Sequence, residues 1–240
     1  MITTDNLSPA NYDRILATNS DIVGKKWWSS TTKVKFETYL AACLAHNPIT
    51  TTLILAAMTF SYIEDLHYPI VMVPFNHPRH GAGYKTKVKS MITGATEIIN
   101  ERLANGETLY DIRESGDSTL VTKVGHILRK TSVDELPQLH NVNMPDSKLR
   151  LVGPRSYGIN EFEFDIKPMI EHNHEVNKFI THLEDGLSFG VLGLASVFDR
   201  HAPLVRRFAT ENIYAERASW IGDVRILAGV LRLSRFANGV

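Results

Sequence analysis

The chain has 240 residues, 43% of them hydrophobic and 22% charged, so it can bury the core of one sizeable domain. Its 26 lysines and arginines balance 26 aspartates and glutamates, so the net charge gives no argument for an acidic partner, and we expect no nucleic acid as a partner. The single cysteine, Cys43, excludes an intrachain disulfide and fits a reducing compartment.

Residues 1–32 are rich in Ser, Thr and Asn and are expected to form a polar N-terminal extension. Near its end, Lys25 and Lys26 precede Trp27 and Trp28. A basic pair beside two tryptophans is typical of a membrane interface, where aromatic rings lie at the depth of the lipid headgroups. A surface helix end or a partly buried aromatic pair would give the same pattern, but we favour the interface.

Residues 38–63 contain no Asp, Glu, Lys or Arg and read TYLAACLAHNPITTTLILAAMTFSYI. This segment is long enough to cross a bilayer, although a buried core helix is an alternative. Asn47 and Pro48 lie near its middle, where the proline is expected to break or kink the helix.

Charges on either side of the apolar segment predict its orientation. Four lysines precede it (Lys25, Lys26, Lys33 and Lys35), whereas Glu64 and Asp65 follow it at once. The positive-inside rule therefore keeps the N-terminus in the cytoplasm. A full span would export the rest of the chain, which looks like a cytoplasmic domain. We therefore expect residues 33–66 to form a re-entrant membrane helix, bent at Asn47-Pro48, and residues 67–240 to form a cytoplasmic domain.

Two strands are predicted after the apolar segment. The first is YPIVMVPF at residues 68–75, and the second follows a glycine-bearing turn. In the second strand Lys85, Lys87 and Lys89 alternate, so they face one side of an extended chain. They indicate either an edge strand protected by lysines or a strip that faces phosphate groups. Considered alone, the lysines favour the edge strand.

The rest of the chain is mainly helical by pattern. We predict a helix ended by Gly106, a short strand that runs into Gly153-Pro154-Arg155, a helical segment over 160–184, a glycine-spaced turn and a terminal amphipathic helix near 205–235. The fold class is therefore α/β, a helix-dominated compact domain with a short sheet. Because no regular βαβ alternation occurs, a Rossmann domain is disfavoured.

The stretch SVDELPQLHNVN, residues 132–143, places Asp134 directly before Glu135. Ser132 and Glu135 also have the spacing of a helix capping box, and the local pattern alone favours that structural role. The neighbouring arginines favour chemistry instead. Two acids that share a divalent cation, with the guanidinium groups of Arg129 and Arg155 to bind phosphate, form a set suited to phosphoryl transfer. Aspartate can act as the nucleophile there, and Mg²⁺ suits hard oxygen ligands.

The chain resembles the bacterial sugar transferase family, the monotopic polyprenyl-phosphate hexose-1-phosphate transferases, from about residue 33 to 235. The motif VGHILRKTSVDELPQLHNV, followed by LVGPR, carries most of the resemblance. Weaker matches are KVKSM, GVLGLASVFDR and YAERASWIGDVRIL, and the Asn-Pro break resembles a Ser-Pro break of the family.

The resemblance implies an enzyme on the cytoplasmic face of the bacterial inner membrane, anchored by a re-entrant helix. Such an enzyme transfers a sugar phosphate from a UDP-sugar to polyprenyl (undecaprenyl) phosphate, releases UMP and starts the synthesis of an exopolysaccharide, capsule or O-antigen unit. Asp134 would be the nucleophile that forms a covalent intermediate, Glu135 its acidic partner, and both would hold Mg²⁺. The residues implied to bind substrate phosphates are Arg129, Arg155, Lys87 and Lys89.

The chain also departs from the family pattern. Lys89 stands where arginine is usual, Leu120 replaces another arginine, and Ser156 replaces the proline after Gly-Pro-Arg. Leu192 and Ser196 replace threonine and glutamine in the glycine-spaced turn. These departures keep an alternative open, namely a membrane-anchored pseudoenzyme or scaffold that retains the fold.

Overall fold

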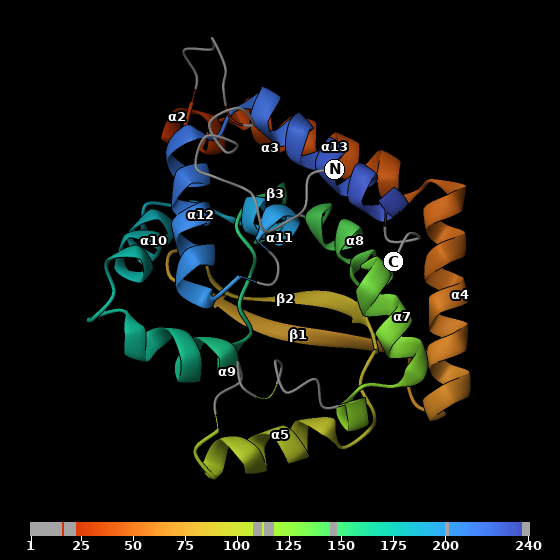
Figure 1. Cartoon of the computed structure of the whole chain (residues 1–240). Coiled ribbons are helices and arrows are strands. Elements are labelled where there is room, and N and C mark those ends of the chain that lie inside the picture. The colour runs from red at the N-terminus through yellow and green to blue at the C-terminus, as the bar shows by residue number, and fades with distance from the viewer. Residues whose placement is uncertain are drawn as a thin grey trace.

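Helices form most of the computed structural model of the chain, which Figure 1 shows. The structure describes residues 23–107, 118–144, 148–199 and 202–236, together with Leu16 and Ile112. Most of the predicted extension at residues 1–32 therefore lies outside the described residues. The α-helices are α2 (Lys25–Trp28), α3 (Thr31–Ala45), α4 (Pro48–Asp65), α5 (Ala95–Ala104), α7 (Lys123–Thr131), α8 (Gln138–Val142), α9 (Ile159–Glu161), α10 (His174–Glu184), α11 (Leu194–Phe198), α12 (Leu204–Arg217) and α13 (Trp220–Phe236). Shorter helical turns are η2 (Ser118–Leu120), η3 (Val133–Glu135), η4 (Phe162–Ile166) and η5 (Lys167–Met169).

The strands form two separate sheets. β1 (Ile70–His77) and β2 (Gly81–Val88) pair antiparallel, with Ile70 opposite Val88 and His77 opposite Gly81. β3 (Leu149–Val152) and β4 (Phe189–Leu192) pair in parallel. The sheets found in the described part of the chain have two strands each, so the expectation of a helix-dominated α/β fold without a Rossmann sheet is confirmed.

The predicted helix break is present between α3 and α4, and local chemistry explains it. The Asn47 side chain accepts a hydrogen bond from the backbone N–H of Ile49, and Pro48 occupies the first turn of α4, where its missing N–H costs nothing. The axes of α3 and α4 differ by 64°. Among the described helices, none alone is long and apolar enough to cross a membrane, but this bent pair is, by length and composition.

The surface of α4 is mostly apolar and exposed. Only Ala57 and Ser61 are buried on it, so the interpretation of this segment as a buried core helix is wrong for α4. Its large exposed side chains are Ile49, Leu53, Leu55, Phe60, Tyr62 and Ile63. By contrast, α3 buries a face that includes Lys33, Glu37, Ala41 and Ala45.

The end of α4 is tied to the rest of the fold by its acidic residues. Glu64 accepts hydrogen bonds from the backbone N–H groups of Lys123 and Val124, at 2.6 and 2.8 Å, and so caps the start of α7. Asp65 forms an ion pair with Lys89, just beyond β2. Figure 1 shows α7 running beside α4.

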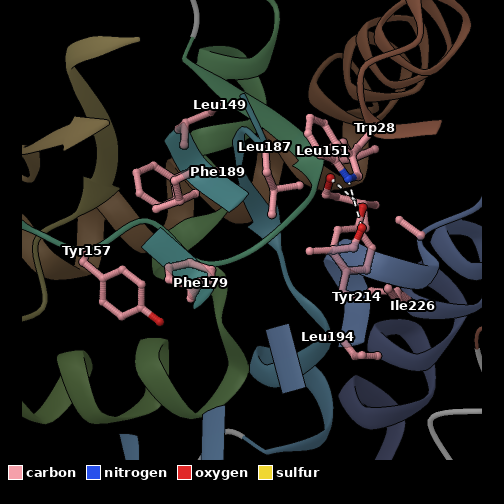
Figure 2. Packing of buried hydrophobic residues seen from close by; sticks show 14 of the residues in the cluster. Trp28, Leu149, Leu151, Tyr157, Phe179, Leu187, Phe189, Leu194, Tyr214 and Ile226 are labelled. Carbon is pink, nitrogen blue, oxygen red and sulfur yellow. Dashed lines mark hydrogen bonds between the residues drawn. The ribbon is translucent and has the colours of Figure 1, made fainter. Parts of the chain in front are cut away.

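The main core lies between the β3–β4 sheet and the helices around it. Figure 2 shows the ring of Tyr157 near that of Phe179, and Leu151 near Trp28 and Tyr214. Both tryptophans of α2 belong to this core, with 5% and 7% of their surface exposed. The Nε1–H group of Trp27 donates to Asp223, and that of Trp28 to a backbone carbonyl. The prediction that this pair lies at a membrane interface is therefore wrong.

Two predicted helices are divided. The segment over 160–184 consists of α9, η4, η5 and α10, with Asn173 capping the start of α10. The terminal helix near 205–235 is α12 followed by α13, because Ala218 is extended and the Ser219 hydroxyl accepts from the N–H of Gly222. Serine at this position is a helix-start signal that the amphipathic pattern hid.

A buried ionic network joins α3 to β3 and α13. The Lys33 ammonium lies 2.7 Å from Glu37 and 2.5 Å from Asp223, and all three side chains are at most 2% exposed. Lys33 also donates to the Val152 carbonyl, and Glu37 accepts from the Val152 N–H. Tyr214 donates to Asp223. β3 leads to Gly153-Pro154-Arg155. Its last residue, Val152, is thus bound to α3 through both its N–H and its carbonyl group.

Candidate active site

The predicted dyad lies at a sharp turn between α7 and α8. Ser132 ends α7 in the left-handed region, at φ 56°, and η3 then carries Asp134 and Glu135. The Ser132 side chain does not cap the following turn; its carbonyl accepts from the Glu135 N–H instead. The capping-box interpretation is therefore wrong, and the Glu135 carboxylate points to β2.

Glu135 lies among cations. Its carboxylate is 2.5 Å from the Lys87 ammonium, and its side chain is 33% exposed. Burial raises the pKa of Glu135, but Lys87, Arg155 and Lys85 outweigh that effect and lower the pKa to about 2. Asp134 beside it is only 5% exposed. The dyad thus joins a carboxylate surrounded by cations, Glu135, to a buried neighbour, Asp134.

The basic strand does not form an exposed lysine edge. Within β2, Lys85 and Lys87 share one face, as the alternation predicted, but Lys85 is 5% exposed and the Lys87 side chain 21%. Lys85 donates to the carbonyl and the hydroxyl of Ser156, at 2.8 and 3.0 Å. Two of the three alternating lysines therefore point toward the dyad and the Gly-Pro-Arg turn.

The Gly-Pro-Arg turn is fixed against the glycine-spaced turn. The Gly153 N–H donates to the carbonyl of Leu192, and the Gly190 N–H donates to that of Pro154. A Cβ atom on Gly190 would lie 2.2 Å from the Gly153 nitrogen, so glycine is required at this close approach. Arg155 follows, 3.3 Å from Glu161.

Sequence reasoning missed Glu211, a buried residue behind the same turn. Its carboxyl is 1% exposed and accepts from the Ala195 N–H. Burial raises the pKa of Glu211 to about 8, although Arg207 and the backbone N–H groups of Ala195 and Arg155 oppose that shift. Along α12 only Arg207, four residues earlier, is a partner of Glu211, because the backbone N–H groups of Ala195 and Arg155 lie on other segments.

Stability should therefore fall as the pH rises from about 4.5, the ordinary pKa of this carboxyl, to about 8. Over that range folded Glu211 holds a proton that the unfolded chain releases, so the free energy of unfolding decreases by up to about 1.4 kcal/mol per pH unit. Urea titrations at several pH values measure the free energy of unfolding. For Glu211→Gln this free energy should decrease less steeply with pH than for the wild type. Glu216→Gln, on the surface of α12, is the control and should behave as the wild type; equal slopes in all three would contradict the assignment.

The two remaining predicted phosphate-binding residues, Arg129 of α7 and Lys89, make contacts at the segment that directly follows β2. Arg129 donates from Nε to the Ser90 hydroxyl at 2.9 Å. Lys89 contacts Asp65 and donates to Thr93 at 2.5 Å, so it links β2 to the end of α4. The structure thus places Lys87 and Arg155 near Glu135. Lys89 instead forms an ion pair with Asp65 at the end of α4.

Asp134 and Glu135 supply the hard oxygen ligands that magnesium prefers. The described residues contain no group of three or more His, Cys, Asp or Glu side chains that could hold a metal ion. Mg²⁺ commonly takes one or two protein carboxylates and completes its coordination with waters or substrate phosphates. Two adjacent carboxylates therefore fit magnesium that binds together with a phosphate substrate, and do not fit zinc held by protein ligands alone.

Comparisons with known proteins indicate the same family as the motif around Asp134 and Glu135. The model of the bacterial sugar transferase family matches residues 28–234. An undecaprenyl-phosphate galactose phosphotransferase of Salmonella typhimurium is 41% identical over 91 residues, which are 35% of this chain and 18% of that protein. An uncharacterized sugar transferase of Haemophilus influenzae is 39% identical over 98 residues, 37% and 20% of the two chains.

The exopolysaccharide production protein ExoY of Sinorhizobium fredii is 29% identical over 162 residues, 64% of this chain and 66% of that protein. The matched stretch thus spans about a fifth of the first two relatives and about two thirds of the third. Because the family match covers nearly the whole chain, including the dyad, the Gly-Pro-Arg turn and the broken helix, this chain belongs to the bacterial sugar transferase family.

Proposed function

We propose that the chain transfers a sugar 1-phosphate from a UDP-sugar to undecaprenyl phosphate. In the first step an Asp134 oxygen attacks the phosphorus next to the sugar, an O–P bond forms, and the pyrophosphate P–O bond breaks to release UMP. In the second step the phosphate of undecaprenyl phosphate attacks the same phosphorus. This step frees the Asp134 carboxylate and yields the lipid-linked sugar diphosphate.

The cationic surroundings of the dyad carry this proposal. Lys87, Lys85 and Arg155 lower the pKa of Glu135 to about 2, so positive charge converges where a diphosphate donor would bind. Arg129 and Lys89 are proposed as further phosphate contacts, on the strength of the family motif. The relative named as an undecaprenyl-phosphate galactose phosphotransferase supports the acceptor and the transferred group, and the one named for exopolysaccharide production supports a role in polysaccharide synthesis.

Magnesium is the proposed metal, held by Asp134 and Glu135. When bound, it would neutralise charge on the phosphate oxygens. Glu135 keeps its negative charge throughout the neutral pH range, because its pKa is about 2. Lys87, 2.5 Å away, orients that carboxylate before substrate binds.

We further propose that residues 33–66 form a re-entrant hairpin in the cytoplasmic leaflet of the bacterial inner membrane, with residues 67–240 as the catalytic domain on the cytoplasmic face. The exposed apolar surface of α4 and the 64° bend at Asn47-Pro48 support this arrangement. A lipid surface offers apolar contacts to side chains such as Ile49, which is 70% exposed.

Ile49→Asp combined with Leu53→Asp should move the chain from the membrane fraction to the soluble fraction. Each buried aspartate costs about 3 kcal/mol on the insertion scale, so the two together outweigh a marginal anchor. Ultracentrifugation of lysates measures the partition. Ile98→Asp, the same substitution at an exposed isoleucine of α5, is the control and should leave the partition unchanged. A double variant that stays in the membrane fraction would contradict the hairpin as the anchor.

The activity itself is tested with membrane fractions, undecaprenyl phosphate, Mg²⁺ and a panel of UDP-sugars, with UMP release as the readout. We expect steady UMP release with one donor, dependent on the lipid acceptor. Without acceptor, the same donor should give a single burst of UMP and an increase in protein mass equal to one sugar phosphate. Folded, membrane-bound protein that is silent with every donor would favour the pseudoenzyme or scaffold instead.

A further inference from the structure

Arg155 contacts two side chains that the family motif does not include, since LVGPR ends at this arginine. Its Nη2 group lies 3.3 Å from a carboxylate oxygen of Glu161, whose side chain is only 6% exposed. Its guanidinium carbon lies 5.8 Å from the centre of the Tyr157 ring. The side chain of Arg155 is itself 30% exposed, so it lies where the core meets the solvent.

The path of the backbone after Arg155 explains how Glu161 reaches it. Gly158 forms an antiparallel bridge with Phe75 of β1, and its extended backbone precedes the first residue of α9. The chain therefore turns back at this point. Glu161, the last residue of α9, lies six residues after Arg155 and yet accepts a hydrogen bond from its side chain.

The Tyr157 ring gives the guanidinium a fixed surface. The ring packs beside those of Phe179 and Phe208, with ring centres 6.1 and 5.4 Å apart, and Figure 2 shows it next to Phe179. A guanidinium with an aromatic ring against its face and a carboxylate at its edge has one preferred orientation. Because arginine has five N–H donors and the bond to Glu161 uses one, further donors can bind a phosphate.

Arg155 also lies close enough to the dyad to affect Glu135. Burial lowers the pKa of Arg155, but Glu161, Tyr157 and Glu135 together raise it above its ordinary value. Arg155 in turn helps to lower the pKa of Glu135. A guanidinium near two carboxylates can pair with either of them. The contact with Glu161 keeps Arg155 from neutralising the carboxylate that is proposed to hold magnesium.

We infer that Glu161 is a positioning residue, which holds the Arg155 guanidinium on Tyr157 in the orientation that binds a phosphate group of the donor. The inference rests on the proposed function, because it assigns a further residue to the same site. Without the Glu161 carboxylate, the guanidinium would pair with Glu135 and would be less available to phosphate. A nucleoside diphosphate would then bind more weakly through its phosphates, with its nucleoside contacts unchanged.

The test measures UDP binding to the full-length chain in detergent with Mg²⁺, by isothermal titration calorimetry. Glu161→Gln removes the charge at nearly constant volume, so it should bind UDP about tenfold more weakly than the wild type. Uridine, measured as a competitor of UDP, should bind both proteins equally. Glu163→Gln, two residues later, removes an exposed ion pair with Lys167 and is the matched control, with unchanged UDP affinity.

A second background separates positioning from a purely structural role. In Arg155→Gln, the further change Glu161→Gln should leave UDP affinity unchanged, because the group that Glu161 positions is already absent. Glu161→Asp keeps the charge on a side chain that is shorter by one methylene. Its UDP affinity should lie between those of the wild type and Glu161→Gln, and it takes the place of Glu161→Gln if that variant does not fold.

Unchanged UDP affinity in folded Glu161→Gln would overturn the inference, as would an equal loss of uridine affinity or a further tenfold loss in the Arg155→Gln background. If Glu161→Asp alone folds, unchanged UDP affinity in that variant has the same meaning. In each case steady UMP release by the wild type would leave the proposed function standing. Wild-type protein that neither binds UDP nor releases UMP would overturn the two together.

Discussion

Asp134→Asn should reduce UMP release by about 10⁴-fold or more, because the amide oxygen cannot form the acyl-phosphate bond that the proposed mechanism requires. Glu135→Gln should be less damaging, by about 10²-fold, since it removes a charge that is oriented by Lys87 but leaves the nucleophile. The measurement is UMP release with the active donor, undecaprenyl phosphate and Mg²⁺. The mass increase expected without acceptor should also disappear in Asp134→Asn.

Two comparisons separate chemistry from folding in this experiment. Asp185→Asn removes an exposed aspartate that pairs with Lys25, and should keep full activity. Membrane association and the melting temperature of Asp134→Asn should remain close to those of the wild type. Substantial turnover in folded Asp134→Asn would exclude this residue as the nucleophile.

Lys33→Met should lower the free energy of unfolding by about 3–5 kcal/mol. The change leaves Glu37 and Asp223 buried, at most 1% exposed, without the ammonium that lies between them. The Val152 carbonyl also loses a donor. Urea unfolding in detergent, followed by tryptophan fluorescence, reports the loss directly because Trp27 donates to the same aspartate.

Lys25→Met is a matched control eight residues earlier in the chain. Its ion pair with Asp185 is 61% and 50% exposed, so its loss should cost less than about 1 kcal/mol. The triple variant Lys33→Met, Glu37→Gln, Asp223→Asn should recover part of the stability, because no buried charge then remains uncompensated. A Lys33→Met variant as stable as Lys25→Met would show that the buried network contributes little.

Sequence reasoning succeeded where the determinant is local. The break at Asn47-Pro48 follows from a proline preceded by a capping residue, and β1 and β2 follow from apolar and alternating patterns. The place of Arg155 near Glu135 was expected from the arginines around the motif. The place of Lys87 followed from the resemblance, because the lysines considered alone favoured an edge strand.

It failed where distant segments decide the outcome. Trp27 packs in the main core, and Asp223, 196 residues away, accepts its N–H group. No local pattern distinguishes that position from a membrane interface. Glu211 and Lys85 acquire their shifted pKa values only when other elements enclose them. Ser132 has the spacing of a capping residue but a left-handed backbone, since it ends one helix before the next turn begins.

Glu64, near the end of α4, caps the start of α7 and so fixes the position of α7 relative to α4. This position bears on how a lipid substrate would reach the dyad. α7 has nine residues and is therefore about 13 Å long, and it runs back along α4 rather than away from it (Figure 1). Leu128 and Val133, at its far end, pack against Ala57 in the middle of α4. The acidic pair thus lies beside the apolar helix. In the proposed membrane arrangement, a long-chain acceptor would therefore reach the dyad by lateral diffusion within its own leaflet, without its tail leaving the bilayer.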